Sequence, residues 1–379
     1  MQMFRVFFYL DLPFPPPPSA PPKRCSSVVP SVIRSATHRL DCRPWRSLKT
    51  ETYMKKTILA FSRVPAELLS SLQSQYKVIL LRPELGDVEA QFRDALPQAH
   101  GMIGALRRLG EAELAAAQQL EIISSISVGY DAYDVDYLSR RGIMLTNTPD
   151  VLTETTADLA FALILATARR LPELDAWVRA GNWDESINES QFGCDVHGKT
   201  LGIIGLGNIG AAIARRGRFG FGMNIIYSGN SPKPELEQEL GARFVSREAL
   251  LGEADFVCPI VPLTPQTHHL IGAEELARMK PDAILINASR GPVVDEAALI
   301  NALQTGQIRA AGLDVYAKEP LTDSPLFRMS NVVCLPHIGS ATRETRMAMA
   351  LRARDNLVAG LEGKRPQDLV NPSAFRSQA

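Results

Sequence analysis

The chain has 379 residues, of which 41 are basic and 41 acidic, and 45% of its residues are hydrophobic. This composition is typical of a globular protein with room for two domains, and it excludes disorder throughout. A formal net charge of zero argues against nucleic acid as a partner, because that binding requires a cationic surface. The most apolar helical stretch, Leu159 to Ala168, is too short to span a bilayer, so we expect no membrane partner.

The five cysteines are scattered along the chain, and none of them forms a CxxC pair. They predict reduced thiols in a cytoplasmic protein and give no sign of a zinc site. The adjacent pair His268-His269 does not indicate a metal site either, because neighbouring side chains point apart and no third ligand is spaced nearby. We therefore expect no metal.

Residues 1–53 differ in composition from the rest of the chain. Seven of the ten residues from Pro13 to Pro22 are proline, and the segment carries eight basic against three acidic residues. We predict a disordered or non-native extension, for which three interpretations are open: an organelle-targeting presequence, a disordered tail, or translated sequence upstream of a true start at Met54. We favour the last, because Met54-Lys55-Lys56 leads directly into a strand pattern.

From residue 57 onward, short apolar runs alternate with amphipathic stretches of helical length. The first series of predicted strands is Thr57–Phe61, Val78–Leu81, Gly101–Ala105, Ile122–Ser127 and Met144–Thr146. The second series is Leu201–Gly205, Asn224–Tyr227, Phe256–Val261, Ala283–Asn287, Ala311–Val315 and Val332–Leu335. This alternation is typical of βαβ units on a parallel sheet, so the two series predict two α/β domains.

Two long helices are predicted outside this alternation. The first, Thr155 to Arg170, lies between the two series, and a Thr155/Asp158 pair of the capping-box type marks its expected start. The second, Thr342 to Leu361, follows the last strand.

The first chemical signal is Gly205-Leu206-Gly207-Asn208-Ile209-Gly210, a GxGxxG pattern that follows a predicted strand and opens an Ala-rich helix. A lone GxGxxG is weak, but this one stands in the context that the motif requires. Gly205 permits the tight turn, Gly207 lets the backbone approach a pyrophosphate, and Gly210 allows close packing of helix and strand. The pattern predicts a dinucleotide-binding site.

The end of the next strand bears on which dinucleotide is bound. NAD enzymes usually place an acidic residue there to bind the ribose 2′-hydroxyl, but this chain has Ser228, Asn230, Ser231 and Lys233. A carboxylate would repel a 2′-phosphate, so this set favours NADPH over NADH. Arg215 or Arg216 is a further candidate for that phosphate, and a relaxed site that accepts NADH as well is the alternative.

Three fragments at the ends of predicted strands supply an Arg, a carboxylate and a His. They are Asn287–Gly291, Gly312–Pro320 and Pro336–Thr342. A 2-keto acid needs a guanidinium to hold its carboxylate or polarise its ketone, and it needs a proton donor for the oxygen that gains charge during hydride transfer. A carboxylate beside the His stabilises the cationic ring, which can then act as that donor.

Taken together, these fragments resemble the D-isomer-specific 2-hydroxyacid dehydrogenase family from Met54 to about Asn371. Ser127–Asp131, Thr148–Glu154, the glycine pattern, the Arg290 fragment and Pro336-His337 follow the family in order. Within the family, Asp195–Gly202 and the missing ribose acid are most similar to bacterial glyoxylate/hydroxypyruvate reductases that also reduce 2-ketogluconate. The resemblance implies a homodimer of chains with two Rossmann-like or flavodoxin-like doubly wound domains and the active site in the cleft between them.

Transferred residue by residue, the resemblance makes Arg290 the substrate-binding and polarising residue, His337 the general acid/base and Glu319 its orienting partner. Val128 and Gly129 would offer backbone amides to the substrate carboxylate. Asp314 would help to hold the nicotinamide carboxamide, while Gly205, Gly207, Asn208, Ile209 and Gly210 form the phosphate loop. Residues 54–153 with 339–371 would bind the substrate, and residues 154–338 the dinucleotide.

The resulting prediction is NAD(P)H-dependent reduction of 2-keto acids to D-2-hydroxy acids, with 2-ketogluconate, hydroxypyruvate and glyoxylate as candidates. The alternative is a nicotinamide-sensing corepressor or scaffold of the same fold, whose relatives keep the same three catalytic residue types. A peptide-binding extension would favour that alternative, and the chain has none after Gly363. The sequence leaves open which 2-keto acid is preferred.

Overall fold

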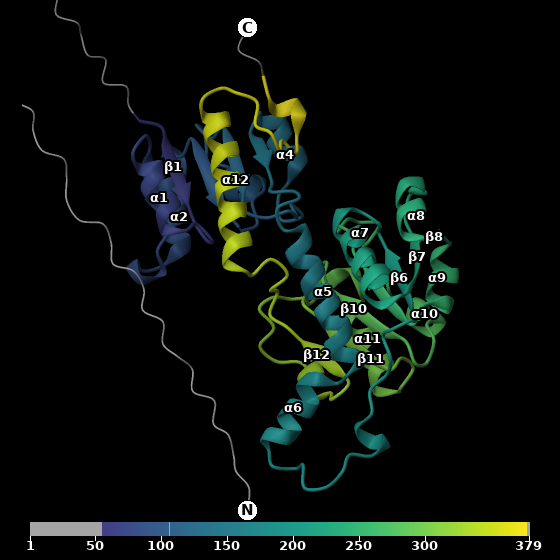
Figure 1. Cartoon of the computed structure of the whole chain (residues 1–379). Coiled ribbons are helices and arrows are strands. Elements are labelled where there is room, and N and C mark those ends of the chain that lie inside the picture. Colours follow the sequence, from purple (N-terminus) through teal and green to yellow (C-terminus); the bar gives the residue numbers. More distant parts are fainter. Residues whose placement is uncertain (1–54, 106, 377–379) are drawn as a thin grey trace, which may run out of the picture. The chain divides into compact units, whose positions relative to one another are not determined.

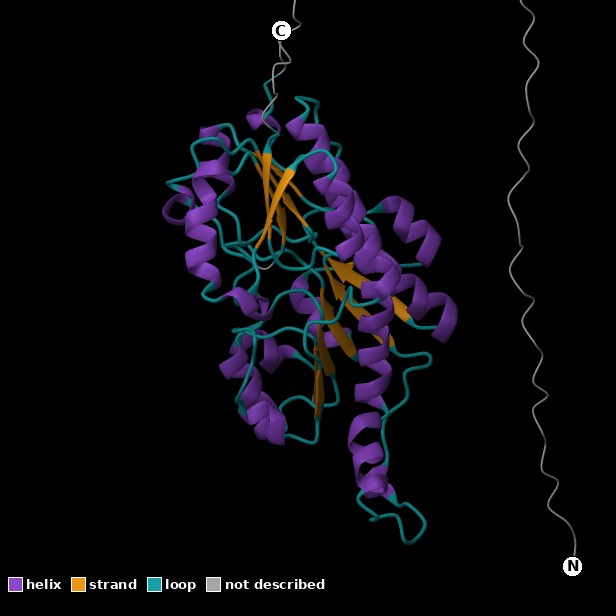
Figure 2. Cartoon of the chain, turned by 90° about the vertical axis from the view of Figure 1, so that its left-hand side faces the viewer, coloured by secondary structure: helices purple, strands orange, loops and turns teal. Residues whose placement is uncertain are grey.

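Two parallel β-sheets organise the part of the chain that the computed structural model describes, residues 55–105 and 107–376 (Figures 1 and 2). Helices cover both faces of each sheet, which confirms the predicted α/β class with two doubly wound sheets. The predictions for residues 1–53 and for a start at Met54 lie outside the described residues.

The first sheet has the strand order β2-β1-β3-β4-β5, and every neighbouring pair is parallel. Its strands are β1 (Thr57–Ala60), β2 (Lys77–Leu80), β3 (Gly101–Gly104), β4 (Ile122–Ser125) and β5 (Met144–Thr146). One face packs against α1 (Ala66–Gln73) and α12 (Arg343–Leu361), and the other against α2 (Val88–Ala95), α3 (Glu111–Leu114) and α4 (Val135–Arg141). The order reverses between β1 and β3, where such sheets bind ligands.

The second sheet has the order β12-β11-β10-β9-β6-β7-β8 and is also parallel throughout. Its strands are β6 (Thr200–Ile204), β7 (Asn224–Ser228), β8 (Arg243–Phe244), β9 (Phe256–Pro259), β10 (Ile284–Asn287), β11 (Ala310–Leu313) and β12 (Val332–Cys334). The helices on one face are α5 (Thr153–Ala168), α7 (Asn208–Arg215) and α8 (Pro234–Leu240); those on the other are α9 (Arg247–Glu253), α10 (Ala273–Arg278) and α11 (Glu296–Gln304).

The start of α5 differs from the prediction. The helix begins at Thr153, its N-cap residue is Leu152, and no side chain caps it. Asp158 instead accepts hydrogen bonds from Arg216, and Thr155 contacts the hydroxyl of Thr345 at 2.5 Å. The capping-box interpretation was therefore wrong, because tertiary partners engage both side chains.

α12 returns the chain to the first sheet after β12. Its N-cap Thr342 accepts a hydrogen bond from the amide of Thr345. At its far end the carbonyl of Leu361 accepts a hydrogen bond from Lys56, just before β1. The helix therefore runs opposite to the strands, and its first turn lies at their carboxyl ends.

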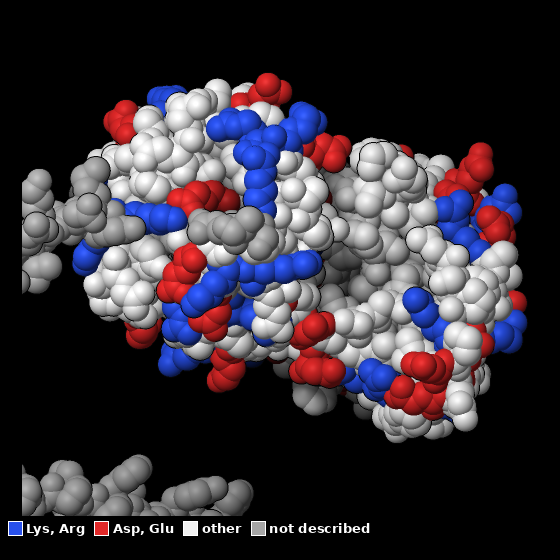
Figure 3. All heavy atoms as spheres, turned by 90° about the horizontal axis from the view of Figure 1, so that it is seen from above, with Lys and Arg blue, Asp and Glu red and all other residues white. Residues whose placement is uncertain are grey.

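None of the helices within residues 55–105 and 107–376 is both long and apolar enough to cross a membrane. On the face shown in Figure 3, basic and acidic side chains are interspersed. The expected division into domains at residues 153/154 and 338/339 stays a prediction.

Candidate active site

The glycine pattern forms a tight turn between β6 and α7. Gly205 has φ +97°, and a Cβ there would lie 2.4 Å from the carbonyl oxygen of Ile260. A Cβ on Gly210 would lie 2.4 Å from the carbonyl of Gly205, so both positions require glycine. Gly207, the N-cap of α7, faces open space, where a Cβ would meet nothing within 4 Å. The free amides at this helix start therefore have room for an anion such as a pyrophosphate.

A pocket of about 500 Å³ adjoins this turn. Its lining comprises Asp150, Thr153, Glu154, Leu206, Gly207, Asn208, Ala211, Arg215, Lys233 and Leu236. Lys233 and Arg215 give it two cationic groups, although Arg215 is already paired with Glu239 at 2.5 and 2.8 Å.

The other residues proposed for cofactor selection lie elsewhere. Ser228 is buried at the end of β7, and Asn230 and Ser231 are exposed on the loop that follows. None of these three belongs to the pocket lining. Arg216 pairs with Glu154 and Asp158 instead. Of the residues proposed to select the cofactor, the structure therefore places Lys233 and Arg215 at the pocket.

Asp150 and Asn208 form a contact that the sequence did not predict. The Asn208 side-chain amide donates to the Asp150 carboxylate at 2.6 Å, and Asp150 has a positive φ of 69°. The only sequence signal for it was the position of Asp150 within the family-like fragment Thr148–Glu154.

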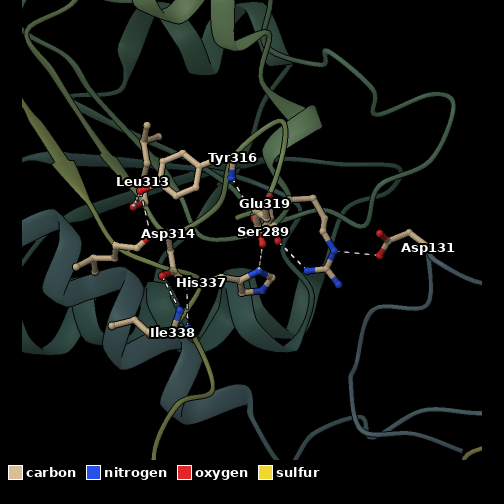
Figure 4. A network of polar contacts seen from close by, with 11 residues as sticks. Asp131, Ser289, Leu313, Asp314, Tyr316, Glu319, His337 and Ile338 are labelled. Atoms are coloured by element: carbon tan, nitrogen blue, oxygen red, sulfur yellow. Dashed lines mark hydrogen bonds and ion pairs between the residues drawn. The ribbon is translucent and has the colours of Figure 1, made fainter. Parts of the chain in front are cut away.

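His337 and Glu319 form a close pair, as predicted. The Nδ1 atom of His337 lies 2.6 Å from a Glu319 carboxylate oxygen, and both side chains are about one-third exposed (32% each; Figure 4). The other Glu319 oxygen accepts from the amide of Tyr316 at 3.1 Å. Burial raises the pKa of Glu319, but hydrogen bonds and the neighbouring cations outweigh it, so its pKa lies below the ordinary value. Glu319 contacts only the Nδ1 side of the ring, so it does not engage Nε2 of His337.

Asp314 holds the backbone that carries His337. Its carboxylate accepts from the amides of Ile338 at 2.7 Å and Gly339 at 2.8 Å, and its carbonyl accepts from the amide of His337 (Figure 4). The side chain is 1% exposed, and burial raises its pKa despite these bonds. In the structure Asp314 therefore fixes the backbone of the loop that carries His337. Its predicted contact with nicotinamide stays a prediction.

Arg290 reaches the loop that follows β4. Its Nε donates to Asp131 at 3.0 Å and its Nη1 to the carbonyl of Ser289 at 2.8 Å. A Cβ on Gly129 would lie 1.6 Å from Nη2 of Arg290, so the guanidinium occupies the space where a side chain would stand. The structure thus brings Arg290 to Gly129, in line with the predicted substrate site. It does so through Asp131, a partner for which no role was predicted.

The amides of Val128 and Gly129 donate no hydrogen bond to other parts of residues 55–105 and 107–376. The carbonyl of Val128 is engaged by the Asn147 side chain at 2.9 Å, which fixes this segment. Two available amides next to a guanidinium are suited to a carboxylate ligand.

Two arginines for which no role was predicted interact electrostatically with these groups. Burial and the charge of Arg346 lower the pKa of Arg63 to about 10, while Glu319 opposes and Arg290 adds to that effect. Burial also lowers the pKa of Arg346, and Asp314 opposes it. Each stands alone in the sequence without a motif around it, so only the fold could have located them.

The two adjacent histidines do not point apart as expected. The rings of His268 and His269 stack with centroids 4.0 Å apart, and Asp295 lies 3.8 Å from His269. Over the described ranges, no group of three His, Cys, Asp or Glu side chains is arranged to hold a metal ion.

Comparisons with known proteins agree on one family. Residues 161–339 match the model of the D-isomer specific 2-hydroxyacid dehydrogenase NAD binding domain. The chain is 50% identical over 324 residues to the glyoxylate/hydroxypyruvate reductase B of Yersinia enterocolitica, covering 85% of this chain and 99% of that protein. The corresponding protein of Escherichia fergusonii is 51% identical over 324 residues, covering 85% and 100%.

Solved structures are similar over nearly the same span. The NADPH-dependent glyoxylate/hydroxypyruvate reductase of Sinorhizobium meliloti, in complex with NADP and malonate, has a TM-score of 0.75 at 35% identity, covering 86% of this chain and 99% of that one. A glyoxylate reductase from Paecilomyes thermophila has a TM-score of 0.74 at 32% identity, covering 83% and 98%.

Proposed function

The chain belongs to the D-isomer-specific 2-hydroxyacid dehydrogenase family, and from this premise we propose that it reduces small 2-keto acids to D-2-hydroxy acids with NADPH. The observation that carries the proposal is the His337–Glu319 pair at 2.6 Å together with Arg290 held over Gly129. The reductases named above act on glyoxylate and hydroxypyruvate, which we propose as substrates, with 2-ketogluconate as a third. None of those relatives is a corepressor or scaffold.

Arg290 and the two free amides bind the substrate. The guanidinium and the amides of Val128 and Gly129 would hold the carboxylate of the keto acid, which places the adjacent ketone near Arg290. A cation beside the ketone oxygen stabilises the negative charge that develops there during reduction. Asp131 fixes the guanidinium from the other side through Nε.

His337 supplies the proton. Because Glu319 accepts at Nδ1, the free Nε2 of the protonated ring would donate to the ketone oxygen, leaving a neutral imidazole. The glycine turn and Lys233 would hold NADPH, whose chemistry when bound would be to provide the hydride that C2 of the keto acid accepts. The carbonyl π-bond breaks, one C–H and one O–H bond form, and the keto acid is reduced to the hydroxy acid.

NADPH preference rests on the absence of an acidic residue after β7 and on Lys233 in the pocket lining. The Sinorhizobium meliloti relative, whose structure holds NADP, supports this choice. NADH is the alternative cofactor.

We also propose that the protein is a cytoplasmic homodimer. Five large apolar side chains are more than two-fifths exposed within a single stretch of α6 (Leu171–Arg179) and the loop after it: Leu171, Val178, Trp183, Ile187 and Phe192. Exposed apolar residues grouped in this way favour a protein contact. The described cysteines Cys194, Cys258 and Cys334 are free, which favours a reducing compartment.

We propose the same substrate-binding and dinucleotide-binding domains that the sequence predicted. Residues 54–153 with 339–371 would bind the keto acid, and residues 154–338 the dinucleotide. The glycine turn in the second part and the Val128–Gly129 segment in the first support this division.

Initial rates of NADPH and NADH oxidation test the proposal. Glyoxylate, hydroxypyruvate and 2-ketogluconate are supplied in turn, and the absorbance of the reduced cofactor is followed. We expect turnover with NADPH well above that with NADH. No turnover with any pair, in a folded sample that binds NADPH, would refute the proposed reaction.

A further inference from the structure

Arg63 lies at a position where ligands bind in doubly wound sheets. It follows β1 (Thr57–Ala60) at the carboxyl end of the first sheet, where the strand order reverses between β1 and β3. It has a positive φ of 65°, which is uncommon for a residue other than glycine. The side chain is partly buried, and no hydrogen bond contributes to the shift of its pKa, which comes from burial and from neighbouring charges.

Arg346 reaches the same edge from α12. Residues three and four apart share a helix face, so Arg346 extends the face of Met349 and Ala350, which are buried against the first sheet. Since α12 runs opposite to the strands, Arg346 lies beyond this apolar contact, toward their carboxyl ends. Val64, next to Arg63, packs against the same apolar cluster. The fold therefore brings the two arginines to one rim.

Arg346 also has an unsatisfied donor. Its Nη1 atom is buried and has no hydrogen-bond partner in the described part of the chain. A buried donor without a partner is costly, and an anion held by both side chains would satisfy it. Arg346 lies in the first turn of α12, which begins at Arg343, six residues after His337, so this rim adjoins the loop that carries the catalytic histidine. The charges of Arg290 and Glu319 act on the pKa of Arg63, in agreement with this placement.

We propose that Arg63 and Arg346 form a second anion subsite beside the keto-acid site, which binds the far end of a substrate whose 2-keto acid end is held by Arg290. The ligand class is a 2-keto acid with a second anionic group, because a guanidinium presents paired donors that match a carboxylate or a phosphate. This inference rests on the proposed reductase function for the placement of the keto acid, but binding at the subsite can be measured without catalysis.

Thermal unfolding measures that binding directly. With NADP⁺ present, the midpoint of the wild-type protein is recorded in malonate, succinate or glutarate, and in the matched monocarboxylates acetate, propionate and butyrate at equal ionic strength. We expect at least one dicarboxylate to raise the midpoint more than its monocarboxylate partner. Equal stabilisation within every pair would overturn the proposal.

Variants then assign the effect to the two arginines. Arg63→Met and Arg346→Met should remove the extra stabilisation by the dicarboxylate, and Arg63→Lys should keep part of it, because the charge remains but the planar fork does not. Arg93→Met, an exposed change on α2, is the control and should keep the wild-type response. If Arg63→Met does not fold, Arg63→Lys and the wild-type comparison still decide the outcome.

Kinetics separates this inference from the proposed function and identifies the anion. Reduction of oxaloacetate and 2-ketoglutarate, of the phosphate ester of hydroxypyruvate, and of glyoxylate is compared in each variant. In Arg63→Met and Arg346→Met, the loss of a charged hydrogen bond should lower kcat/KM for the favoured dianion about 10- to 100-fold more than kcat/KM for glyoxylate. Equal losses would refute the subsite. Retained dicarboxylate binding with no reduction of any keto acid would refute the reductase function and leave the subsite standing.

Discussion

Replacing Gly129 with alanine tests whether Arg290 works from the position seen here. The new Cβ would lie 1.6 Å from Nη2 and 2.7 Å from Cζ of Arg290. An ordinary contact between heavy atoms is about 3.5 Å or longer, so the guanidinium must move by about 2 Å. It is the far end of a flexible side chain, so the fold should persist while the contact with the substrate is lost.

The size of the effect follows from this displacement. A misplacement of about 1 Å can cost about 100-fold in rate, so we expect kcat/KM for glyoxylate to fall by at least about 100-fold, or about 2.7 kcal/mol of transition-state stabilisation. The assay is NADPH oxidation, with the unfolding midpoint of each variant measured in parallel. Gly252→Ala in α9, where a Cβ meets nothing within 4 Å, is the matched control.

Two outcomes are informative for Gly129→Ala. A stable protein with a large loss of kcat/KM supports the role of Arg290. A variant that keeps kcat/KM within about threefold of the wild type would refute the reasoning, because a guanidinium displaced by about 2 Å could not hold the substrate as proposed.

Three further results are expected. His337→Ala should lose at least about 100-fold in kcat while binding NADPH normally in a fluorescence titration; near-normal turnover would reject the general-acid role. Lys233→Met should raise the KM for NADPH about tenfold and leave that for NADH nearly unchanged, whereas equal effects would exclude a 2′-phosphate contact. The pKa of Asp255 is lowered, since its bonds to the amide of Thr200 and to Lys280 outweigh the opposing effect of burial. Its stabilising contribution is therefore present above the unfolded pKa of about 4 and is lost as pH falls through the lower folded value. The difference in unfolding free energy between the wild type and Asp255→Asn, from urea titrations, should shrink on acidification; a constant difference would contradict this.

The sequence predicted the strands well where burial decided them. β1, β9 and β10 are buried along their whole length, as expected of apolar runs in a parallel sheet. β8 was missed because Arg243–Phe244 is only two residues long and exposed at the sheet edge, so it leaves no apolar run. Local sequence patterns therefore identify the central strands but miss short strands at the edge of a sheet.

Some residues of the candidate site could likewise be predicted from the sequence, and others could not. The glycine turn and the His337–Glu319 pair could be expected because each lies within a short motif whose spacing is meaningful. The contact of Arg290 with Asp131 joins residues 159 positions apart, and it depends on two loops meeting in space. Arg63 and Arg346 have no motif, and their shared position follows only from the strand order and the direction of α12.

The return of α12 to the first sheet has a consequence for how the chain matures during synthesis. The strands of the second sheet and the helices between them are continuous from Thr200 to Cys334, so that sheet is complete once this span has left the ribosome. The first sheet emerges earlier but must wait, because the face that includes Ile58 and Ile122 is covered by α12, which ends at Leu361. A nascent chain that stalls before this helix would present an uncovered apolar sheet to chaperones.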